Sequence, residues 1–251
     1  MRIAVAGGTG VVGTMVVDQA RERGHEVAVV SRSHGVDLIT GEGLDQALEG
    51  VTAVVDATNV GTMDADASVE FFSATTRTLL DGERRAGVQR HIALSIVGVD
   101  RAPYDYYAGK RAQERDIEAG EMPWTILRAT QFHEFADQMY SMATVGPWHV
   151  APRMRTQPVA AREVASRLVD LAEAPARGGY VELAGPREES LADMVRRAAR
   201  ARGRLGRRGW MPSVPVPGPL GRAQRSGALL PDAGAELGVE TFTQWLARTA
   251  G

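Results

Sequence analysis

One stretch decides the fold of this chain, and it reads Ile3-Ala4-Val5-Ala6-Gly7-Gly8-Thr9-Gly10-Val11-Val12-Gly13. Its first four residues are β-branched or small and apolar, a pattern typical of a strand that is covered on both faces. The glycines follow directly, and apolar residues then recur at helical spacing as far as residue 23. The stretch therefore predicts a strand, a tight turn and a helix in direct succession.

The glycine spacing of this turn has a physical reason. One glycine allows the tight turn, another lets the backbone approach a pyrophosphate, and Gly13 lets the helix pack closely on the strand, while free amides at the helix N-terminus receive negative charge. Residues 25–30 read as the next strand and complete a βαβ unit. We therefore predict a dinucleotide site; a glycine-rich turn without a ligand is the alternative. The site would comprise Gly7, Gly8, Thr9, Gly10, Val11, Val12 and Gly13.

The end of the second strand indicates which dinucleotide is bound. A site selective for NAD usually has an acidic residue here, which binds the ribose hydroxyls. This chain has Ser31-Arg32-Ser33 instead. A guanidinium pairs with a 2′-phosphate, and hydroxyls can donate to it, whereas a carboxylate would repel it. NADP(H) is therefore favoured over NAD(H), although Arg32 as a solvated loop residue is the alternative.

Strands and helices continue to alternate along the chain. We predict a short strand at residues 35–38, a short helix at 43–48 and a buried strand at 52–57. Such alternation is typical of an α/β fold with a doubly wound parallel sheet of the Rossmann type, whose ligands bind at the carboxyl ends of the strands. Further cofactor contacts are therefore expected from Asp37 and Leu38 beside the adenine, and from Ala57, Thr58 and Asn59 near the middle of the cofactor.

A candidate catalytic group follows two elements later. Residues 89–95 read as a strand that ends in Ser95, and a helical stretch begins at Tyr106. Lys110 stands four residues after Tyr106, so both side chains are expected on one helix face, where the cation would favour the phenolate. A tyrosine so tuned can exchange a proton with a carbonyl oxygen, and Ser95 could bind the same oxygen. The alternative is a solvated helix pair.

The glycine spacing together with Ser95 and Tyr106-x-x-x-Lys110 resembles the short-chain dehydrogenase/reductase superfamily, and the layout resembles its atypical NmrA-like branch. The resemblance extends to the strands expected at residues 124–128 and 181–186. It implies a Rossmann fold with a small C-terminal substrate lobe, Tyr106 as acid/base, Lys110 as its tuning group and as a ligand of the nicotinamide ribose, and Ser95 as the residue that orients the substrate. Ala129 stands where relatives often have proline, so the following loop is expected to differ in shape. Gly109 is expected to loosen the helix by about 1 kcal/mol relative to alanine.

The remaining half of the chain is expected to supply the substrate lobe. We predict a nucleotide-binding unit over residues 1–130 and C-terminal segments over 131–251 that form the lobe and complete the sheet. Helices are expected within residues 130–142, 158–173 and 237–246, and the proline-rich residues 212–219 are expected to be a surface connection. The candidate substrate-pocket residues are Tyr107, Gln131, Phe132 and His133.

Composition limits the remaining classes of function. The chain has 251 residues, 44% of them hydrophobic, with a formal charge of −2, so we expect a small molecule rather than nucleic acid or membrane as the partner. It has no cysteine, and neither thiolate nor histidine ligands are spaced for a metal. An arginine-rich run over residues 194–208 is interpreted as a solvated helix face, with an anionic partner as the alternative. We expect a cytoplasmic NADP(H)-dependent oxidoreductase acting on a carbonyl or quinone-like substrate; the alternatives are a dinucleotide-binding redox sensor and a nucleic-acid-associated regulator.

Overall fold

The computed structural model describes residues 1–145, 148–205 and 211–249. These residues form two compact units. Unit 1 comprises Met1–Arg128 and Arg162–Val181, and unit 2 comprises Ala129–Ala161 and Glu182–Gly251. The chain thus leaves unit 1 after Arg128, and residues 162–181 belong to unit 1 again.

A seven-stranded sheet forms the centre of the fold, in the order β13-β10-β5-β4-β3-β1-β2. The register joins Ala6 to Val30 on one side and to Asp56 on the other, and the pairings of β1 with β2 and β3, of β3 with β4 and of β10 with β13 are all parallel. The order reverses at β1, which confirms the predicted doubly wound α/β sheet. The strands are β1 (Arg2–Ala6), β2 (Glu26–Val30), β3 (Ala53–Asp56), β4 (Arg90–Ile96), β5 (Trp124–Ala129), β10 (Gly179–Ala184) and β13 (Glu236–Leu237).

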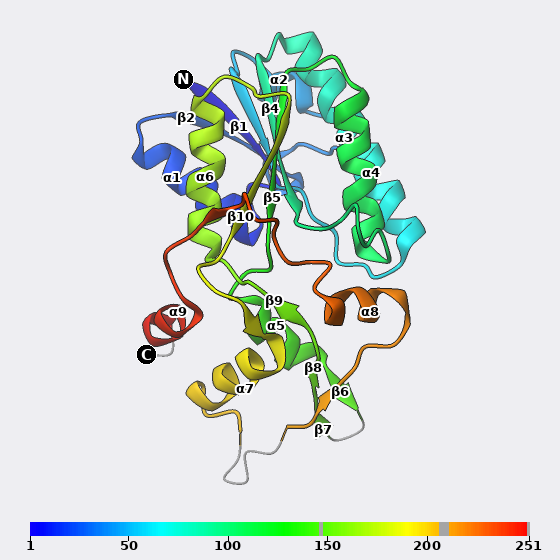
Figure 1. Ribbon diagram of the computed structural model, residues 1–251. Helices are drawn as coiled ribbons and strands as arrows, with labels where there is room; N and C mark the ends of the chain where they lie inside the picture. The colour runs from blue at the N-terminus through cyan, green and yellow to red at the C-terminus, as the bar shows by residue number, and fades with distance from the viewer. Residues whose placement is uncertain (146–147, 206–210, 250–251) are drawn as a thin grey trace. The chain divides into compact units, whose positions relative to one another are not determined.

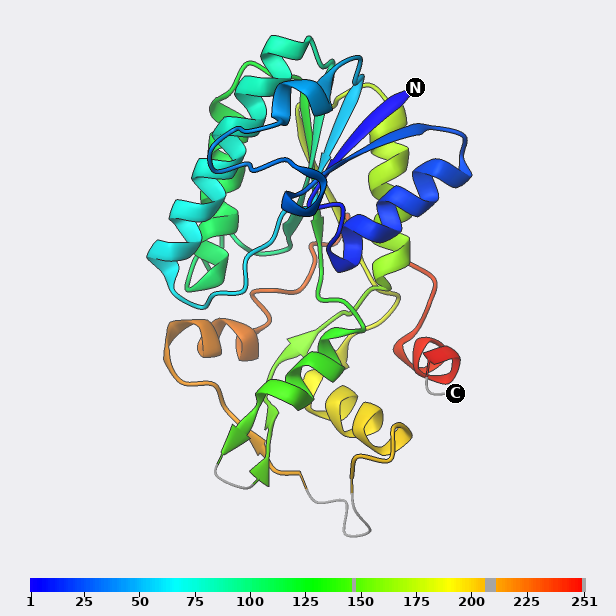
Figure 2. The same cartoon turned by 180° about the vertical axis from the view of Figure 1, so that it is seen from behind.

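Helices cover both faces of the sheet in unit 1. Helices α1 and α6 lie on one face, and α2, α3 and α4 lie on the other (Figures 1 and 2). Buried strand residues such as Ile3, Ala4 and Val54 fill the core between these layers. The helices of this unit are α1 (Val11–Glu22), α2 (Leu44–Leu48), α3 (Ala65–Ala86), α4 (Tyr106–Ala119) and α6 (Ala161–Glu173), with a 3₁₀ turn at Arg32–His34.

Unit 2 consists of short helices and two-stranded sheets. Strand β9 pairs antiparallel with β11, β8 pairs parallel with β12, and β6 pairs antiparallel with β7. Among the described helices of the chain, none has the length and apolarity that crossing a membrane requires. The elements are α5 (Phe135–Met142), α7 (Leu191–Ala201), α8 (Gly218–Ser226), α9 (Phe242–Thr249), β6 (Thr144–Val145), β7 (Trp148–His149), β8 (Ala151–Pro152), β9 (Arg155–Thr156), β11 (Glu189–Ser190) and β12 (Ser213–Val214).

Three local predictions were wrong. Residues 35–38 form no strand, because Gly35 adopts a left-handed conformation with φ of 76° and Asp37 Oδ1 accepts the amide of Ile39 at 2.7 Å, which curls the backbone. The expected helix at 237–246 begins only at Phe242, since Leu237 belongs to the edge strand β13. Residues 212–219 are not solely a connection: they contain β12 and the first turn of α8, where Pro219 occupies a position that tolerates proline.

Candidate functional site

The glycine turn after β1 leaves no room for side chains at two positions. Gly7 has φ of 72°, and a Cβ atom there would lie 2.6 Å from the carbonyl oxygen of Ala57. A Cβ atom on Gly13 would lie 2.1 Å from the carbonyl oxygen of Gly7. Helix α1 begins after Gly10 without a side-chain cap, so its first amides are open to an external acceptor.

A cavity of about 800 Å³ lies beside this turn in unit 1. The ends of β1, β2 and β3 all contribute to its wall, as expected for the carboxyl edge of a doubly wound sheet. Among the predicted cofactor residues, the cavity is lined by Gly7, Thr9, Gly10, Ser31, Arg32, Ser33, Asp37, Leu38, Ala57, Thr58 and Asn59.

Other predicted cofactor residues do not line this cavity. Gly8 is buried in the turn, and Val12 and Gly13 are buried in α1. Val11, the first residue of α1, has 65% of its surface exposed. Sequence reasoning missed several lining residues, because they come from the last residue of β2, the curled segment after β2, the loop after β3 and helix α3, for which no ligand pattern exists. These are Val30, Val36, Ile39, Val60, Gly61, Phe71 and Thr75.

The side chains around Arg32 form a small polar cluster. Ser31 Oγ lies 3.1 Å from Ser33 Oγ and 2.8 Å from His34 Nδ1, and Ser33 Oγ lies 3.2 Å from the same nitrogen. Arg32 itself is exposed and lines the cavity. The end of β2 thus carries hydroxyls and a guanidinium at the cavity wall, and the cluster adds His34, which the sequence analysis did not single out.

Asp56 connects the loop after β3 to helix α4. It is 1% exposed, its Oδ1 accepts the amide of Thr58 at 2.9 Å, and its Oδ2 accepts Gln113 Nε2 at 2.8 Å. Gln113 Oε1 in turn accepts Lys110 Nζ at 2.5 Å. Sequence reasoning missed Asp56 and Gln113; the only signal was a carboxylate within an otherwise apolar buried strand, where it requires hydrogen-bond partners.

Tyr106 reaches the wall of the cavity beside the glycine turn. Its hydroxyl donates to Asn59 Oδ1 at 2.7 Å, and Asn59 is one of the lining residues. The ring packs edge-on against Phe72 and against the neighbouring Tyr107, with centroids 5.8 and 6.0 Å apart. Burial, with a smaller contribution from Tyr107, raises the pKa of the Tyr106 phenol above its usual range. The phenol therefore keeps its proton at neutral pH.

Lys110 and the Tyr106 hydroxyl form hydrogen bonds with different partners. Its ammonium donates to Gln113 and stands 4.6 Å from the centre of the Phe72 ring, which also contacts Tyr106. The side chain is 3% exposed, and burial lowers its pKa to about 8, although Asp56 and Glu114 act in the opposite direction. The expected direct pairing of lysine and tyrosine is not among the hydrogen bonds of the described residues.

Ser95 is likewise engaged elsewhere. It is 2% exposed and donates to Glu114 Oε1 at 2.7 Å. Both oxygens of Glu114 also accept hydrogen bonds from Arg128, each at 2.8 Å, and Arg111 lies 3.0 Å from Oε2. A buried carboxylate requires several donors, and the Ser95 hydroxyl is one of those that it uses.

Gly109 has a packing role that its helix propensity does not reveal. A Cβ atom at this position would lie 2.1 Å from Ser68 Oγ and 2.5 Å from the Ser68 carbonyl oxygen. Ser68 Oγ donates to the carbonyl of Tyr106 at 3.0 Å, so α3 and α4 touch beside the tyrosine. The glycine therefore brings the two helices together where Tyr106 begins α4.

The predicted pocket residues of unit 2 serve its internal structure. Gln131 Oε1 accepts Thr156 Oγ1 at 2.9 Å, and Phe132 forms a bridge with Val159. His133 is fully buried, its Nε2 lies 3.0 Å from the carbonyl oxygen of Glu240, and its ring packs against Phe242 and Trp245.

Several arginines of the arginine-rich run form ion pairs with acidic side chains. Residues 206–208 of this run lie outside the described residues. Four of its other arginines form ion pairs within unit 2: Arg196 with Asp193, Arg197 with Glu189, and Arg202 and Arg204 with Asp137.

Comparison with known proteins identifies relatives of this chain. A family of NAD(P)H-binding proteins matches residues 7–175. The photosystem II assembly factor Ycf39 of Synechocystis is 27% identical over 147 residues, which cover 53% of this chain and 45% of that protein. A second Ycf39, from Trieres chinensis, is 24% identical over 57% of this chain and 49% of its own length, so the chain spans about half the length of these curated relatives.

Solved structures resemble the chain over nearly its whole length. A short-chain dehydrogenase/reductase superfamily protein from Agrobacterium tumefaciens with bound NAD has a TM-score of 0.72 and 20% identity, covering 100% of this chain and 96% of its own. An NADPH-dependent quinone oxidoreductase from Escherichia coli has a TM-score of 0.68 and 16% identity, with 98% of both chains covered. At such identities the likeness shows a shared fold.

Proposed function

The chain belongs to a family of NAD(P)H-binding proteins. From this premise we propose that it is an NADP(H)-dependent oxidoreductase of the atypical NmrA-like branch of the short-chain dehydrogenase/reductase superfamily. The proposed substrate is a small carbonyl or quinone-like compound, with Tyr106 as the acid/base. The observation that carries the proposal is the hydrogen bond from the Tyr106 hydroxyl to Asn59 at the wall of the cofactor cavity.

The residues around the cavity fit a dinucleotide. The volume suffices for a cofactor-sized ligand, and the bare backbone at Gly7 and Gly10 beside the uncapped start of α1 fits a pyrophosphate. Thr58 and Asn59 would line its middle. When bound, the dinucleotide supplies or accepts the hydride, and the protein positions it and handles the proton.

The preference for NADP(H) is supported by the cluster at the end of β2. Arg32 lines the cavity without a carboxylate partner among the described residues, and Ser31 and Ser33 present hydroxyls beside it. A guanidinium with neighbouring hydroxyl donors suits a 2′-phosphate. The one carboxylate in this part of the wall, Asp37, already accepts the amide of Ile39.

The proposed role of Tyr106 follows from its protonation state. The raised pKa keeps the phenol neutral, so its hydroxyl is a hydrogen-bond donor at the cavity wall. A substrate carbonyl oxygen that replaces Asn59 Oδ1 as acceptor would take the phenolic proton as hydride reaches the carbonyl carbon. Tyr106 would then recover a proton from solvent.

Lys110 gives a further reason to propose chemistry here. It is the only lysine among the chain's 29 lysines and arginines. An ammonium is compact and changes its pKa readily when buried, whereas a guanidinium is planar and stays charged. A chain that otherwise uses arginine therefore has its one lysine at a buried position four residues after Tyr106, where a titratable cation would be useful.

The second candidate function is a dinucleotide-binding sensor without turnover. One observation favours it: Ser95 and Lys110 direct their hydrogen bonds to Glu114 and Gln113, and neither bonds to the Tyr106 hydroxyl. Two relatives are named as assembly factors, which is compatible with a regulatory role.

Cofactor oxidation separates the two functions. The protein would be incubated with NADPH and a panel of quinones and small aldehydes and ketones, with NADPH consumption followed by absorbance and cofactor affinity measured by calorimetry. Turnover of at least one compound, with NADPH preferred over NADH, is expected. Tight NADPH binding with no consumption across the panel would instead favour the sensor.

A further inference from the structure

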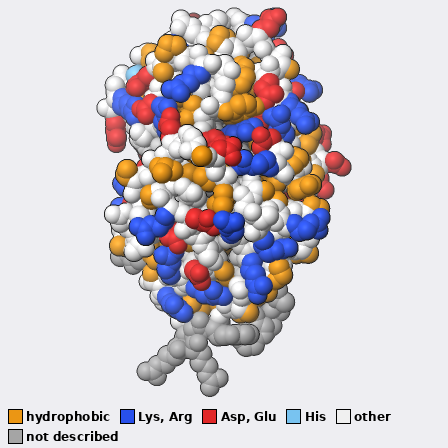
Figure 3. All heavy atoms as spheres, in the orientation of Figure 1, with side chains coloured by type: hydrophobic (Ala, Val, Ile, Leu, Met, Phe, Trp, Pro, Cys, Tyr) orange, Lys and Arg blue, Asp and Glu red, His pale blue; other side chains and the backbone are white. Residues whose placement is uncertain are grey.

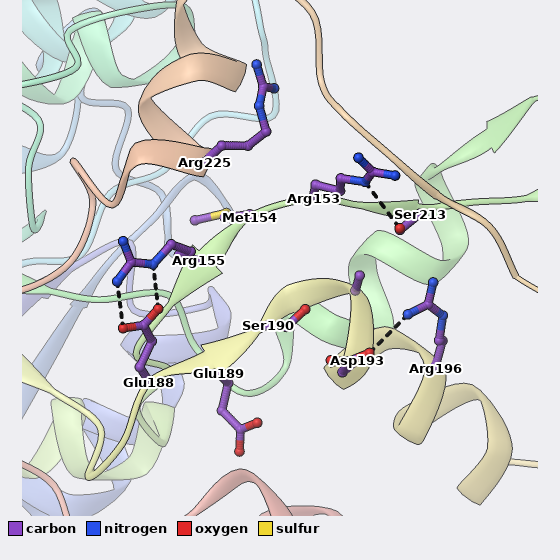
Figure 4. A pocket seen from close by; sticks show the side chains of 11 residues that line it. Arg153, Met154, Arg155, Glu188, Glu189, Ser190, Asp193, Arg196, Ser213 and Arg225 are labelled. Atoms are coloured by element: carbon purple, nitrogen blue, oxygen red, sulfur yellow. Dashed lines mark hydrogen bonds and ion pairs between the residues drawn. The ribbon is translucent and has the colours of Figure 1, made fainter.

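A second cavity, of about 630 Å³, lies wholly within unit 2 and shares no lining residue with the cofactor cavity. It is formed where β9, β11 and β12 meet the first turn of α7 and the end of α8 (Figure 4). Polar and charged side chains dominate its wall. The lining residues that the argument uses are Arg153, Arg155, Glu188, Ser190, Arg196 and Arg225.

Every carboxylate in this wall already has an arginine partner. The partner of Glu188 is bidentate, with N–O distances of 2.6 and 3.0 Å. The three pairs are Glu188 with Arg155, Asp193 with Arg196, and Glu189 with Arg197, the last of which lies outside the lining. The negative charge of the wall is therefore compensated before any ligand is considered.

Two arginines of the wall have no such compensation. Arg153 Nε donates to Ser213 Oγ at 3.3 Å, and Arg225 Nη1 donates to the carbonyl of Val216 at 2.8 Å. No carboxylate pairs with either guanidinium in the part of the chain that the structure describes. Each bond anchors its side chain and leaves further N–H donors of the guanidinium available. With Arg197 counted as the partner of Glu189, the charged residues at the cavity have an excess of two positive charges, whereas the lining residues alone have an excess of one.

The start of α7 adds a hydroxyl donor. Ser190 is the N-cap residue of this helix, yet its side chain accepts no amide of the first turn. Figure 4 shows the Ser190 side chain among the labelled side chains of the wall. On the face seen in Figure 3, basic side chains are spread over the upper and the lower part, with acidic side chains between them.

We propose that this cavity binds the phosphoryl group of a small molecule, held by Arg153 and Arg225 with help from Ser190. A phosphate monoester carries about −1.5 to −2 charges at neutral pH and offers three acceptor oxygens, which matches two uncompensated guanidiniums and a hydroxyl. A carboxylate would balance only one of the two charges. The cavity volume falls within the usual range for small-molecule sites. This inference does not depend on the proposed oxidoreductase activity.

Calorimetry with defined anions tests the proposal. Inorganic phosphate, phenyl phosphate and acetate would each be titrated into the protein at low salt with saturating NADPH, which blocks phosphate binding in the cofactor cavity. The variants are Arg153→Gln and Arg225→Gln. The matched control is Arg200→Gln, because Arg200 is an exposed arginine of α7 that does not line the cavity. Thermal melting and NADPH affinity verify that each variant is folded.

Saturable phosphate binding that exceeds acetate binding, and that falls at least tenfold in Arg153→Gln and in Arg225→Gln but not in Arg200→Gln, is the expected result. Tighter binding of phenyl phosphate than of inorganic phosphate would identify an organic phosphate as the ligand, and equal binding would identify free phosphate. The proposal fails if neither phosphate binds saturably, if all three variants lose binding equally, or if duplex DNA displaces the bound phosphate, because DNA would then be the ligand of a wider basic surface.

Discussion

Replacing Lys110 by methionine should reveal how much the protein pays to bury its only lysine. The pKa of this ammonium falls from 10.5 to about 8 on burial, and each pKa unit is worth about 1.4 kcal/mol, so keeping it charged costs about 3 kcal/mol below pH 8. Methionine has a similar shape and no charge. It would remove this cost but leave Gln113 Oε1 without its donor, a loss of about 1–3 kcal/mol. The two effects nearly cancel at pH 7.

The sign of the pH dependence follows from proton counts. Between pH 8 and 10.5 the unfolded chain binds a proton on Lys110 that the folded protein has released, so the stability of the wild type rises with pH in this window. The methionine variant lacks this group. The free energy of unfolding of the wild type minus that of the variant should therefore increase by about 3 kcal/mol from pH 8 to 10.5.

Urea unfolding followed by tryptophan fluorescence at several pH values measures this difference. Selective labelling with ¹³C-lysine gives an independent reading, since one lysine yields one Cε resonance, and its chemical shift should titrate with a midpoint near pH 8. A stability difference that stays flat across the window, together with a midpoint near 10.5, would refute the assignment of Lys110 as a buried, easily deprotonated cation.

Three further substitutions test the packing and the cofactor site. Gly109→Ala should destabilise the protein by about 1–3 kcal/mol in urea unfolding despite the better helix propensity of alanine, because its Cβ meets Ser68; Gly120→Ala, where the nearest atom is 3.4 Å away, is the control that should change little. Gly13→Ala should weaken NADPH binding at least tenfold by calorimetry, and unchanged affinity would contradict the close approach at the turn. Arg32→Gln should lower the preference for NADPH over NADH about tenfold, measured as a ratio of dissociation constants, and an unchanged ratio would remove Arg32 from the cofactor site.

The nucleotide-binding turn could be predicted because its requirements are local. Gly7 and Gly13 are needed by the backbone of the turn itself, and the strand and helix that flank them have clear periodicity. The segment after β2 was harder to predict from the sequence. Residues 35–38 have the composition of a strand, but the left-handed conformation of Gly35 and the hydrogen bond accepted by the Asp37 side chain determine its shape. The pattern of hydrophobic residues does not predict such local hydrogen bonds.

The candidate catalytic residues show a second limit. Helical spacing predicts which face of α4 Lys110 occupies. It cannot predict that the ammonium donates to Gln113, whose side chain also donates to Asp56 in strand β3. The strand containing Ser95 was predicted, yet the partner of its hydroxyl depends on the buried Glu114. The hydrogen-bond partners of buried polar groups depend on tertiary packing, which cannot be predicted from the pattern of a single sequence.

Single-turnover reduction by the Tyr106→Phe variant tests the central claim most directly. The protein would be mixed with saturating NADPH and then with a substrate identified from the panel, while the Kd for NADPH is measured separately. Loss of the phenolic proton donor should lower the rate constant by about 10²–10⁴-fold and leave the Kd nearly unchanged. A variant that reduces the substrate as fast as the wild type would contradict the role of Tyr106 as the acid.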